Sequence, residues 1–327
     1  MKTAKSIVWL VLVFLVATQA FGGIQGFSIC TNSFVQQNPD VSGNIVVWED
    51  KRNGNWDIYG YDLSTGAEFP ISLGEYDQKW PVVSGDMVLW TDTGSSGCSE
   101  DCDIYGYNLS TGSGFSFFPE RGGRMQPAID DNIFIYWDRG KLQGYSLSTQ
   151  NSFFVAEIPS SGYDISGEIV IWLDPYRAKA LYGHNLSTKE DFPICDNGRI
   201  PYYPAIEGEI VVWVDDRNGN RDVWGYNLLT GTEFPICTEG HDQQTVNISG
   251  DLVTWEDRRH DRLSIYGYNL STGRESFYIE GANAAIDGDL LVWRNKDNIY
   301  GAFIPEPATL ITLLIGASFL VVRKRSR

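Results

Sequence analysis

Acidic side chains are the residues of this sequence best suited to chemistry, because Asp and Glu number 42 against 25 Lys and Arg. Hydrolysis of a glycosidic bond needs two carboxyl groups set a defined distance apart. The prominent aspartates, however, recur at one position of a repeated phrase, at Asp50, Asp92, Asp138, Asp174, Asp215 and Asp257. Such repetition indicates a role in each repeat unit. An enzyme would instead show one unrepeated acid–base pair converging on the centre of the fold.

Other catalytic motifs are missing from the sequence. It contains no nucleophile elbow, no HExxH phrase and no phosphate-binding loop. The three histidines, His184, His241 and His260, lie in different repeats and lack the spacing of metal ligands. We therefore predict that the protein is not an enzyme and uses no cofactor.

The densest polar group is the segment DKRNGNWD that begins at Asp50. Its Asn-Gly pair favours a two-residue hairpin turn, and counting outward places Asp50 opposite Asp57. Facing like charges destabilise a strand pair unless something lies between them, and the favoured bridge is Arg52. The second copy repeats this arrangement with Asp215, Arg217 and Asp222. A bound Ca²⁺ is the alternative, since Asp and Asn oxygens are its usual ligands. Its candidate ligands are Asp50, Asp57, Asp215 and Asp222.

The five cysteines fall into two groups. Cys98 and Cys102 lie in a long loop, Gly94 to Asp101, that replaces a tight turn, and an oxidising compartment would join them in a local disulfide. The other three, Cys30, Cys195 and Cys237, share one position in different repeats. We expect these three to be buried small hydrophobic residues.

These residues are positioned by an internal repeat. The phrase "Ser-Gly, acidic, apolar, Val, apolar, Trp" occurs in seven copies, which begin at Ser42, Ser84, Asp130, Ser166, Glu207, Ser249 and Asp287. Each is followed by a second phrase of the type IYGYNLSTG. The period of about 40 residues is that of a four-stranded propeller blade. The sequence therefore predicts an all-β, seven-bladed β-propeller.

Strand register and ring closure can also be predicted. Counting residues outward from the Asn53-Gly54 turn places Trp48 opposite Tyr59 on the neighbouring strand. The corresponding pairs in other repeats are Trp213 with Trp224, Trp255 with Tyr266, Tyr136 with Gln143 and Trp293 with Tyr300. We expect these aromatic side chains to pack between adjacent blades. The seventh copy ends after its third strand, and Phe27 to Thr31 matches the missing fourth strand, so the N-terminal segment should close the ring.

Both ends of the chain have the composition of targeting segments. Residues 1–22 carry Lys2 and Lys5, then an apolar run and a small-residue stretch, as a secretory signal does. Residues 305–327 contain an apolar run at 308–322 followed by a basic end, which predicts a membrane-spanning segment with the body outside. The propeller then comprises residues 23–304. Its acidic character disfavours nucleic acid as a partner and favours cations or neutral glycans.

Two resemblances to known families sharpen this interpretation. Pro305-Glu306-Pro307, the apolar run and the basic end together resemble the PEP-CTERM sorting signal, which implies processing by an exosortase. The repeats resemble those of TolB-like cell-surface propellers, with the pattern WxDxRNGNxDIYGYDLSTGxEFPI nearly complete from Trp48 to Ile71 and from Trp213 to Ile236. The resemblance implies an extracellular propeller and carries no catalytic residues. The expected location is the cell surface or extracellular matrix, after transient anchoring in the inner membrane.

The partner should bind where the seven copies differ. Turns between first and second strands and between third and fourth strands are uniform, whereas the other two loop sets vary and emerge on one face. Aromatic and arginine residues carry most binding energy. The candidates are Tyr76, Trp80, Arg121, Arg124, Tyr176, Arg177, Arg199, Tyr202, Tyr203, His241 and Arg259. The predicted function is a non-catalytic binding or scaffold module for a polysaccharide or envelope protein. The alternative is a propeller-fold hydrolase or lyase acting on matrix polysaccharide.

Overall fold

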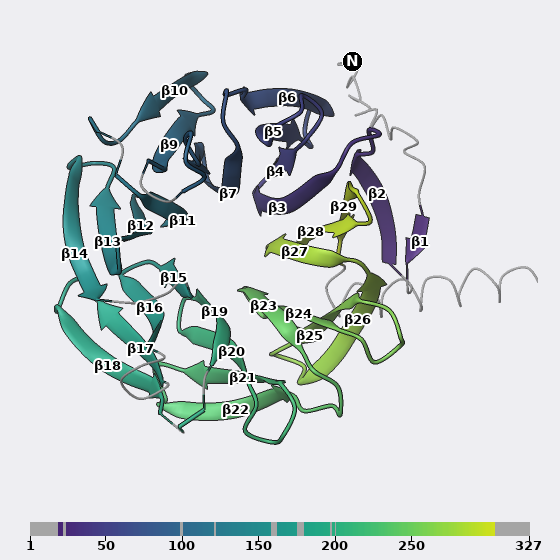
Figure 1. Ribbon diagram of the computed structural model, residues 1–327. Helices are drawn as coiled ribbons and strands as arrows, with labels where there is room; N and C mark the ends of the chain where they lie inside the picture. Colours follow the sequence, from purple (N-terminus) through teal and green to yellow (C-terminus); the bar gives the residue numbers. More distant parts are fainter. Residues whose placement is uncertain are drawn as a thin grey trace, which may run out of the picture.

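The computed structural model describes residues 19–21, 24–98, 101–120, 122–157, 162–174, 180–196, 198–199 and 201–304. Within these residues the elements are all strands, and seven antiparallel sheets stand around a central axis (Figure 1). The predicted all-β seven-bladed propeller is confirmed. The sorting segment from Pro305 onward and most of the predicted signal segment lie outside the described residues. The part of the chain that is described has no helix long and apolar enough to cross a membrane.

Each blade has four strands that succeed one another from the axis outward (Figure 1). The first strands are β3 (Gln36–Ser42), β7 (Gln78–Ser84), β11 (Arg124–Asp130), β15 (Tyr163–Ser166), β19 (Tyr202–Glu207), β23 (Gln244–Ser249) and β27 (Ala282–Asp287). The second strands are β4 (Ile45–Asp50), β8 (Met87–Asp92), β12 (Ile133–Asp138), β16 (Ile169–Asp174), β20 (Ile210–Asp215), β24 (Leu252–Asp257) and β28 (Leu290–Asn295).

The outer half of each blade holds its third and fourth strands. The third strands are β5 (Asp57–Asp62), β9 (Asp103–Asn108), β13 (Lys141–Ser146), β17 (Ala180–Asn185), β21 (Asp222–Asn227), β25 (Ser264–Asn269) and β29 (Asn298–Phe303). The fourth strands are β6 (Ala67–Ser72), β10 (Ser113–Ser116), β14 (Asn151–Glu157), β18 (Glu190–Cys195), β22 (Thr232–Cys237), β26 (Arg274–Glu280) and β2 (Ile24–Cys30). A short strand, β1 (Gln19–Phe21), pairs with the outer edge of β2.

The ring is closed by the N-terminal strand, as predicted. Strand β2 pairs antiparallel with β29, with Phe27 opposite Gly301 and Ser28 opposite Tyr300. The first and last segments of the body therefore share one sheet (Figure 1). This pairing covers a sheet edge that would otherwise be open.

All five predicted cross-strand pairs have the predicted register. Trp48 stacks on Tyr59 with ring centroids 6.4 Å apart, and both pack against residues of the seventh blade such as Val292. The aromatic layer thus lies between blades. The turn differs from the predicted two-residue form, because Gly54 N–H bonds to Lys51 O at 3.1 Å and only Gly54 of the Asn-Gly pair has positive φ.

The glycine of the IYGY phrase has a packing role that the sequence did not reveal. A Cβ at Gly60 would lie 2.8 Å from the ring of Phe69, and one at Gly225 would lie 2.5 Å from the ring of Phe234. Because a phenylalanine of the fourth strand covers the glycine of the third in these blades, the two phrases recur together.

Candidate functional site

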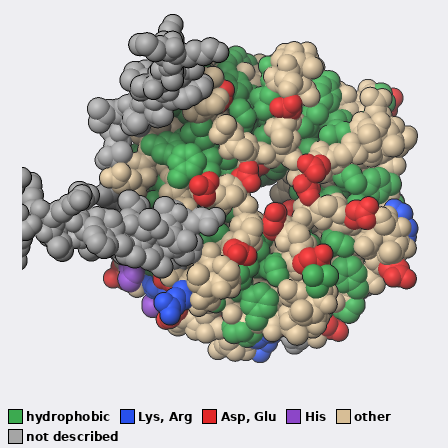
Figure 2. Space-filling model, turned by 180° about the vertical axis from the view of Figure 1, so that it is seen from behind, with side chains coloured by type: hydrophobic (Ala, Val, Ile, Leu, Met, Phe, Trp, Pro, Cys, Tyr) green, Lys and Arg blue, Asp and Glu red, His purple; other side chains and the backbone are tan. Residues whose placement is uncertain are grey.

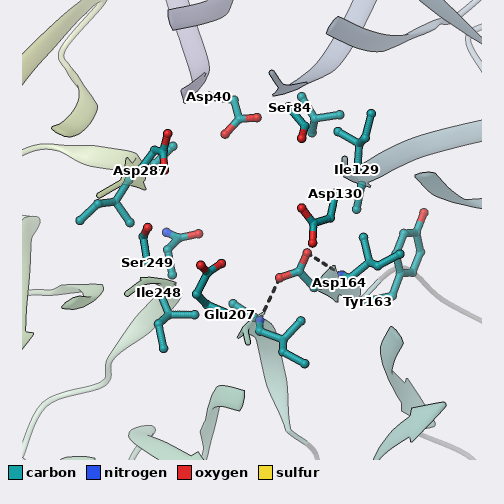
Figure 3. Close-up of a pocket in the computed structure, with 18 of the residues that line it drawn as sticks. Asp40, Ser84, Ile129, Asp130, Tyr163, Asp164, Glu207, Ile248, Ser249 and Asp287 are labelled. Atoms are coloured by element: carbon teal, nitrogen blue, oxygen red, sulfur yellow. Dashed lines mark hydrogen bonds between the residues drawn. The ribbon is translucent and has the colours of Figure 1, made fainter. Parts of the chain in front are cut away.

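A cavity of about 590 Å³ occupies the axis of the ring. The first strands of all seven blades line it, and Asp and Glu side chains gather around the central opening on the face in Figure 2. Five carboxyl groups point toward this space in Figure 3. They belong to Asp40, Asp130, Asp164, Glu207 and Asp287. A volume of this size suits a small molecule or several sugar units.

A bulge in the first strands directs side chains into the cavity. Six of the first strands shift register at the same position, and the residue there has left-handed φ, near 50° at both Trp80 and Tyr203. The Trp80 N–H is held by Glu49 Oε1 of the preceding blade at 2.8 Å. Bulges of this kind redirect a side chain next to a site. Trp80 and Tyr203 consequently line the cavity, and Tyr203 remains 44% exposed.

Two of the cavity carboxylates, Asp40 and Asp164, occupy the same position in the first and fourth blades, and no other blade has an acidic residue there. The corresponding positions in the other blades are Val82, Ala128, Ala205, Asn247 and Ala285. Asp40 accepts a bond from Val83 N–H of the next blade at 2.8 Å, and Asp164 accepts one from Ile206 N–H at 2.9 Å. Burial raises the pKa of Asp40 to about 6 and that of Asp164 to about 7. These two groups can therefore hold or release a proton near neutral pH.

The sequence analysis did not single out Asp40 and Asp164. Their signal was present, because a comparison of the seven first strands would have shown two aspartates where most copies are apolar. Both residues line the cavity at the centre of the ring, but they occupy one repeat position in two blades and so differ from the unrepeated acid–base pair stated as the criterion for an enzyme.

A ring of hydrogen bonds joins the blades at the mouth of the cavity. The side chain that ends a first strand accepts a bond from the turn N–H of the next blade, as from Gly85 to Ser42 Oγ at 3.1 Å. Six of the seven junctions carry this bond, and Asp287 closes the ring onto Gly43 at 2.6 Å. Within the described contacts Glu207 is the exception. Burial, followed by the charges of Asp130 and Asp287, raises the pKa of Glu207.

The predicted ligand residues are dispersed rather than gathered. Trp80 and Tyr203 line the cavity, and Tyr202 lies beside Tyr203 with ring centroids 6.4 Å apart. The guanidinium of Arg221 covers Tyr202 at 4.5 Å. Three other candidates, Arg121, Tyr176 and Arg177, lie outside the described residues.

The remaining candidates lie away from the axis. Arg124 pairs with Asp103 at 3.1 Å, and Arg259 pairs with Asp257 at 2.7 Å, so both arginines are held by carboxylates of the fold. Arg199 is exposed and lies 4.0 Å from Asp216. The backbone carbonyls of Tyr76 and His241 each accept a bond from an asparagine side chain, which fixes their loops.

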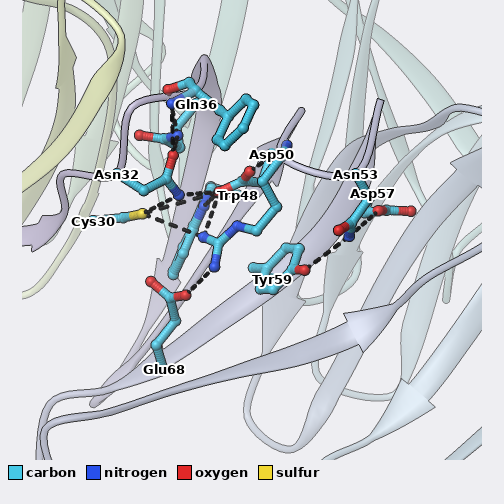
Figure 4. A network of polar contacts seen from close by, with 11 residues as sticks. Cys30, Asn32, Gln36, Trp48, Asp50, Asn53, Asp57, Tyr59 and Glu68 are labelled. Atoms are coloured by element: carbon cyan, nitrogen blue, oxygen red, sulfur yellow. Dashed lines mark hydrogen bonds and ion pairs between the residues drawn. The ribbon is translucent and has the colours of Figure 1, made fainter. Parts of the chain in front are cut away.

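The arginine of the acidic hairpin bridges a different pair of carboxylates from the predicted one (Figure 4). Arg52 binds Asp50 at 2.6 Å and Glu68 of the fourth strand at 2.5 Å, and does not reach between Asp50 and Asp57. Asp57 instead accepts a bond from Asn53 Nδ2 at 2.8 Å. The predicted facing of the two aspartates is correct, but the second one is held by a hydrogen bond from asparagine and not by the arginine.

This arrangement, which we call the arginine clasp, occurs three times. Its members are Cys30, Asp50, Arg52 and Glu68; Cys195, Asp215, Arg217 and Glu233; and Cys237, Asp257, Arg259 and Glu275. In each clasp the cysteine of the preceding blade contacts the arginine, and an aromatic ring lies about 4 Å from the guanidinium carbon. The three cysteines are buried, as predicted, and also join adjacent blades.

The calcium candidates have protein partners in the structure. Asp50 and Asp215 bind arginine, while Asp57 and Asp222 accept bonds from asparagine side chains. Among the described residues no three His, Cys, Asp or Glu side chains are grouped as metal ligands would be. Cys98 and Cys102 are free thiols here, so the predicted disulfide is not formed in this structure. Their mutual hydrogen bond is the largest cause of the raised pKa of Cys98.

Several solved structures share this fold. An oligogalacturonate lyase in complex with manganese superimposes with a TM-score of 0.64 at 13% identity, over 88% of this chain and 96% of that one. The oligogalacturonate lyase from Vibrio parahaemolyticus gives 0.67 at 10% identity over the same shares. TolB from Acinetobacter baumannii gives 0.54 at 12% identity, over 81% of this chain and 64% of that one. By sequence, no family model and no curated protein matches the chain.

These likenesses establish a TolB-like propeller fold, and at such identities they establish the fold alone. They also overturn the prediction that the protein is not an enzyme. That prediction treated a ring of repeated blades as a binding scaffold, whereas propellers that superimpose on most of this chain are lyases. Enzymes and TolB share this architecture, so repetition of the blades does not argue against catalysis.

Proposed function

We propose that this protein is an exported cell-surface or matrix propeller that binds a polysaccharide in its central cavity. The observation that carries the proposal is the cavity itself, in which Trp80 and Tyr203 stand on bulged strands beside carboxylates from several blades. Flat aromatic side chains supply contact area to a sugar ring, and carboxylates accept its hydroxyl hydrogen bonds. A rigid ring of blades holds both in place.

A second candidate is a propeller-fold hydrolase or lyase acting on the same polysaccharide. The observation that favours it is the presence of Asp40 and Asp164 on the cavity wall, where their raised pKa values suit proton transfer near neutral pH. Both side chains accept backbone hydrogen bonds from the next blade. Such bonds fix the carboxyl groups and also link blades, so the pair has a structural use besides any catalytic one.

Export and sorting are part of the proposal. We propose residues 1–22 as the signal peptide, 23–304 as the propeller and 305–327 as the PEP-CTERM tail, with 308–322 as the transient inner-membrane anchor. An exosortase would act on the segment with Pro305, Glu306 and Pro307. The order of these three parts in the sequence supports this proposal.

The test measures binding and turnover on the same samples. A panel of oligosaccharides is titrated against the purified protein, and each mixture is then assayed for new reducing ends and for new unsaturated ends. The double variant Trp80→Ala with Tyr203→Ala should weaken binding roughly tenfold or more, because it removes the aromatic wall. Phe154→Ala, an exposed aromatic on β14 outside the cavity, serves as the matched control and should bind normally.

The two candidates separate in this experiment. New chain ends that disappear in Asp164→Asn would establish the hydrolase or lyase. Tight binding that the Trp80→Ala and Tyr203→Ala double variant leaves unchanged would move the ligand away from the cavity and contradict the proposal.

A further inference from the structure

The ionisable side chains that the structure describes along the central cavity include acidic groups but no basic ones. Five carboxyl side chains line it, and none of the described lining residues is Lys, Arg or His. Arg52, Arg217 and Arg259 lie outside this lining and are paired with the carboxylates of the clasps. The ionised groups that a ligand meets on the cavity wall are therefore all negative.

The carboxylates surround the cavity instead of clustering on one side. Asp40, Asp130, Asp164, Glu207 and Asp287 come from five different blades and face the same space (Figure 3). Their mutual repulsion acts together with burial to raise the pKa of Asp40, Asp164 and Glu207. A positive group at the centre would lie near several of them and relieve that repulsion.

The aromatic side chains add a separate, uncharged element to the site. Trp80, Tyr163 and Tyr203 lie on the cavity wall, from the second, fourth and fifth blades. An aromatic face attracts an ammonium group as well as offering contact to an apolar surface. A ligand that combines a ring-shaped body with amino groups would use both the aromatic side chains and the carboxylates.

We propose that the glycan bound in the cavity carries free amino groups, as a glucosamine polymer does. This inference rests on the proposed binding function and names its ligand class. Uronic acid polymers are disfavoured, because each of their carboxylates would face the acidic wall without a counter-charge. The chain would thus differ in substrate charge from the lyases whose fold it shares.

The experiment compares matched tetrasaccharides by calorimetric titration against the full-length protein at about pH 6, where sugar amines are protonated. The probes are a glucosamine tetramer, its fully N-acetylated form and a galacturonate tetramer. We expect the glucosamine tetramer to bind at least tenfold more tightly than the acetylated one, and the galacturonate tetramer not to bind. Added salt should weaken the first interaction most.

Charge-neutralising variants test whether the cavity is responsible. Glu207→Gln with Asp130→Asn should weaken glucosamine binding roughly tenfold and leave N-acetylated binding unchanged. Glu209→Gln removes a neighbouring exposed carboxylate outside the cavity lining and should change neither. Unaltered melting temperatures show that the variants fold.

The outcomes distinguish the two proposals. Equal or tighter binding of the acetylated or galacturonate tetramer would overturn the amino-glycan inference while leaving a polysaccharide-binding cavity. Binding of spermidine as tightly as the glucosamine tetramer would show a cation site without glycan selectivity, and would also overturn it. Failure of all three tetrasaccharides to bind would contradict the proposed function itself.

Discussion

Aspartates of this propeller occupy two contrasting environments. In the arginine clasps, burial would raise the pKa of Asp50 and Asp215, but hydrogen bonds from Arg52 and Arg217 hold it below its usual value. In the cavity, Asp40 and Asp164 have only backbone N–H donors among their described hydrogen-bond partners, and burial raises their pKa. The same side chain is therefore firmly ionised in one region and easily protonated in the other.

The contrast separates structural carboxylates from functional candidates. Each clasp repeats the same partners and joins one blade to the fourth strand of the preceding one. The cavity aspartates occur in only two of the seven blades, at a position that is apolar in four others. In a repeat protein, a residue that recurs in many repeat units stabilises the fold of each unit. A residue that departs from the repeat indicates a role beyond the fold of its own unit.

The largest expected effect comes from breaking a clasp. Arg217→Ala would leave Asp215, which is fully buried, without its counter-charge. We expect the free energy of unfolding to fall by roughly 3 to 5 kcal/mol, the usual cost of removing one partner of a buried pair. Urea denaturation measures this change. Arg262→Ala, which breaks an exposed pair with Glu280, should leave the denaturation midpoint unchanged. Equal effects of the two variants would mean that the clasps add nothing to stability.

A change in pH should have an intermediate effect on the free energy of unfolding. The raised pKa values of Asp40 and Asp164, about 6 and 7, mean that the folded chain binds these protons more tightly than the unfolded chain. The stability that they add is therefore full below the ordinary carboxyl pKa and is lost as pH rises toward 6 and 7, at up to about 1.4 kcal/mol per pH unit for each group. The clasp aspartates act oppositely, because their lowered pKa gives stability that is lost in acid.

The measurement is the urea midpoint between pH 5 and pH 8, which should fall as pH rises. Asp164→Asn keeps a side-chain oxygen for the Ile206 N–H but removes the titration, so its slope should be flatter. A wild-type midpoint that does not change over this range would show that the cavity carboxylates are not destabilised by burial.

The smallest effect concerns the mouth of the cavity. Glu207→Ser restores the serine found in four other blades and would accept the turn N–H of Gly250. We expect a gain of about 1 kcal/mol or less, the usual net value of one hydrogen bond. Ser249→Ala removes such a bond to Gly288 and should cause a loss of similar size. If Glu207→Ser instead destabilises the protein, Glu207 contributes to the ring in another way.

The sequence by itself determined the fold. Seven copies of one phrase set the number of blades, and the match between Phe27 to Thr31 and the fourth strands set the closure. Cross-strand register followed from counting, because side chains alternate with a period of two and a shift by one residue would expose every buried aromatic. The pairing of Trp48 with Tyr59 shows how directly this argument works.

Tertiary structure alone decided which polar groups meet. Arg52 lies two residues from Asp50 along the chain, but its second partner, Glu68, comes from the fourth strand and its cysteine contact from the preceding blade. Asp40 and Asp164 lie more than a hundred residues apart and face one cavity because the ring brings all seven first strands to the axis. Repeats along the chain predict each blade and the closure of the ring, but which single residues of different blades come to face one another depends on their positions in the closed ring, which spacing along the chain does not encode.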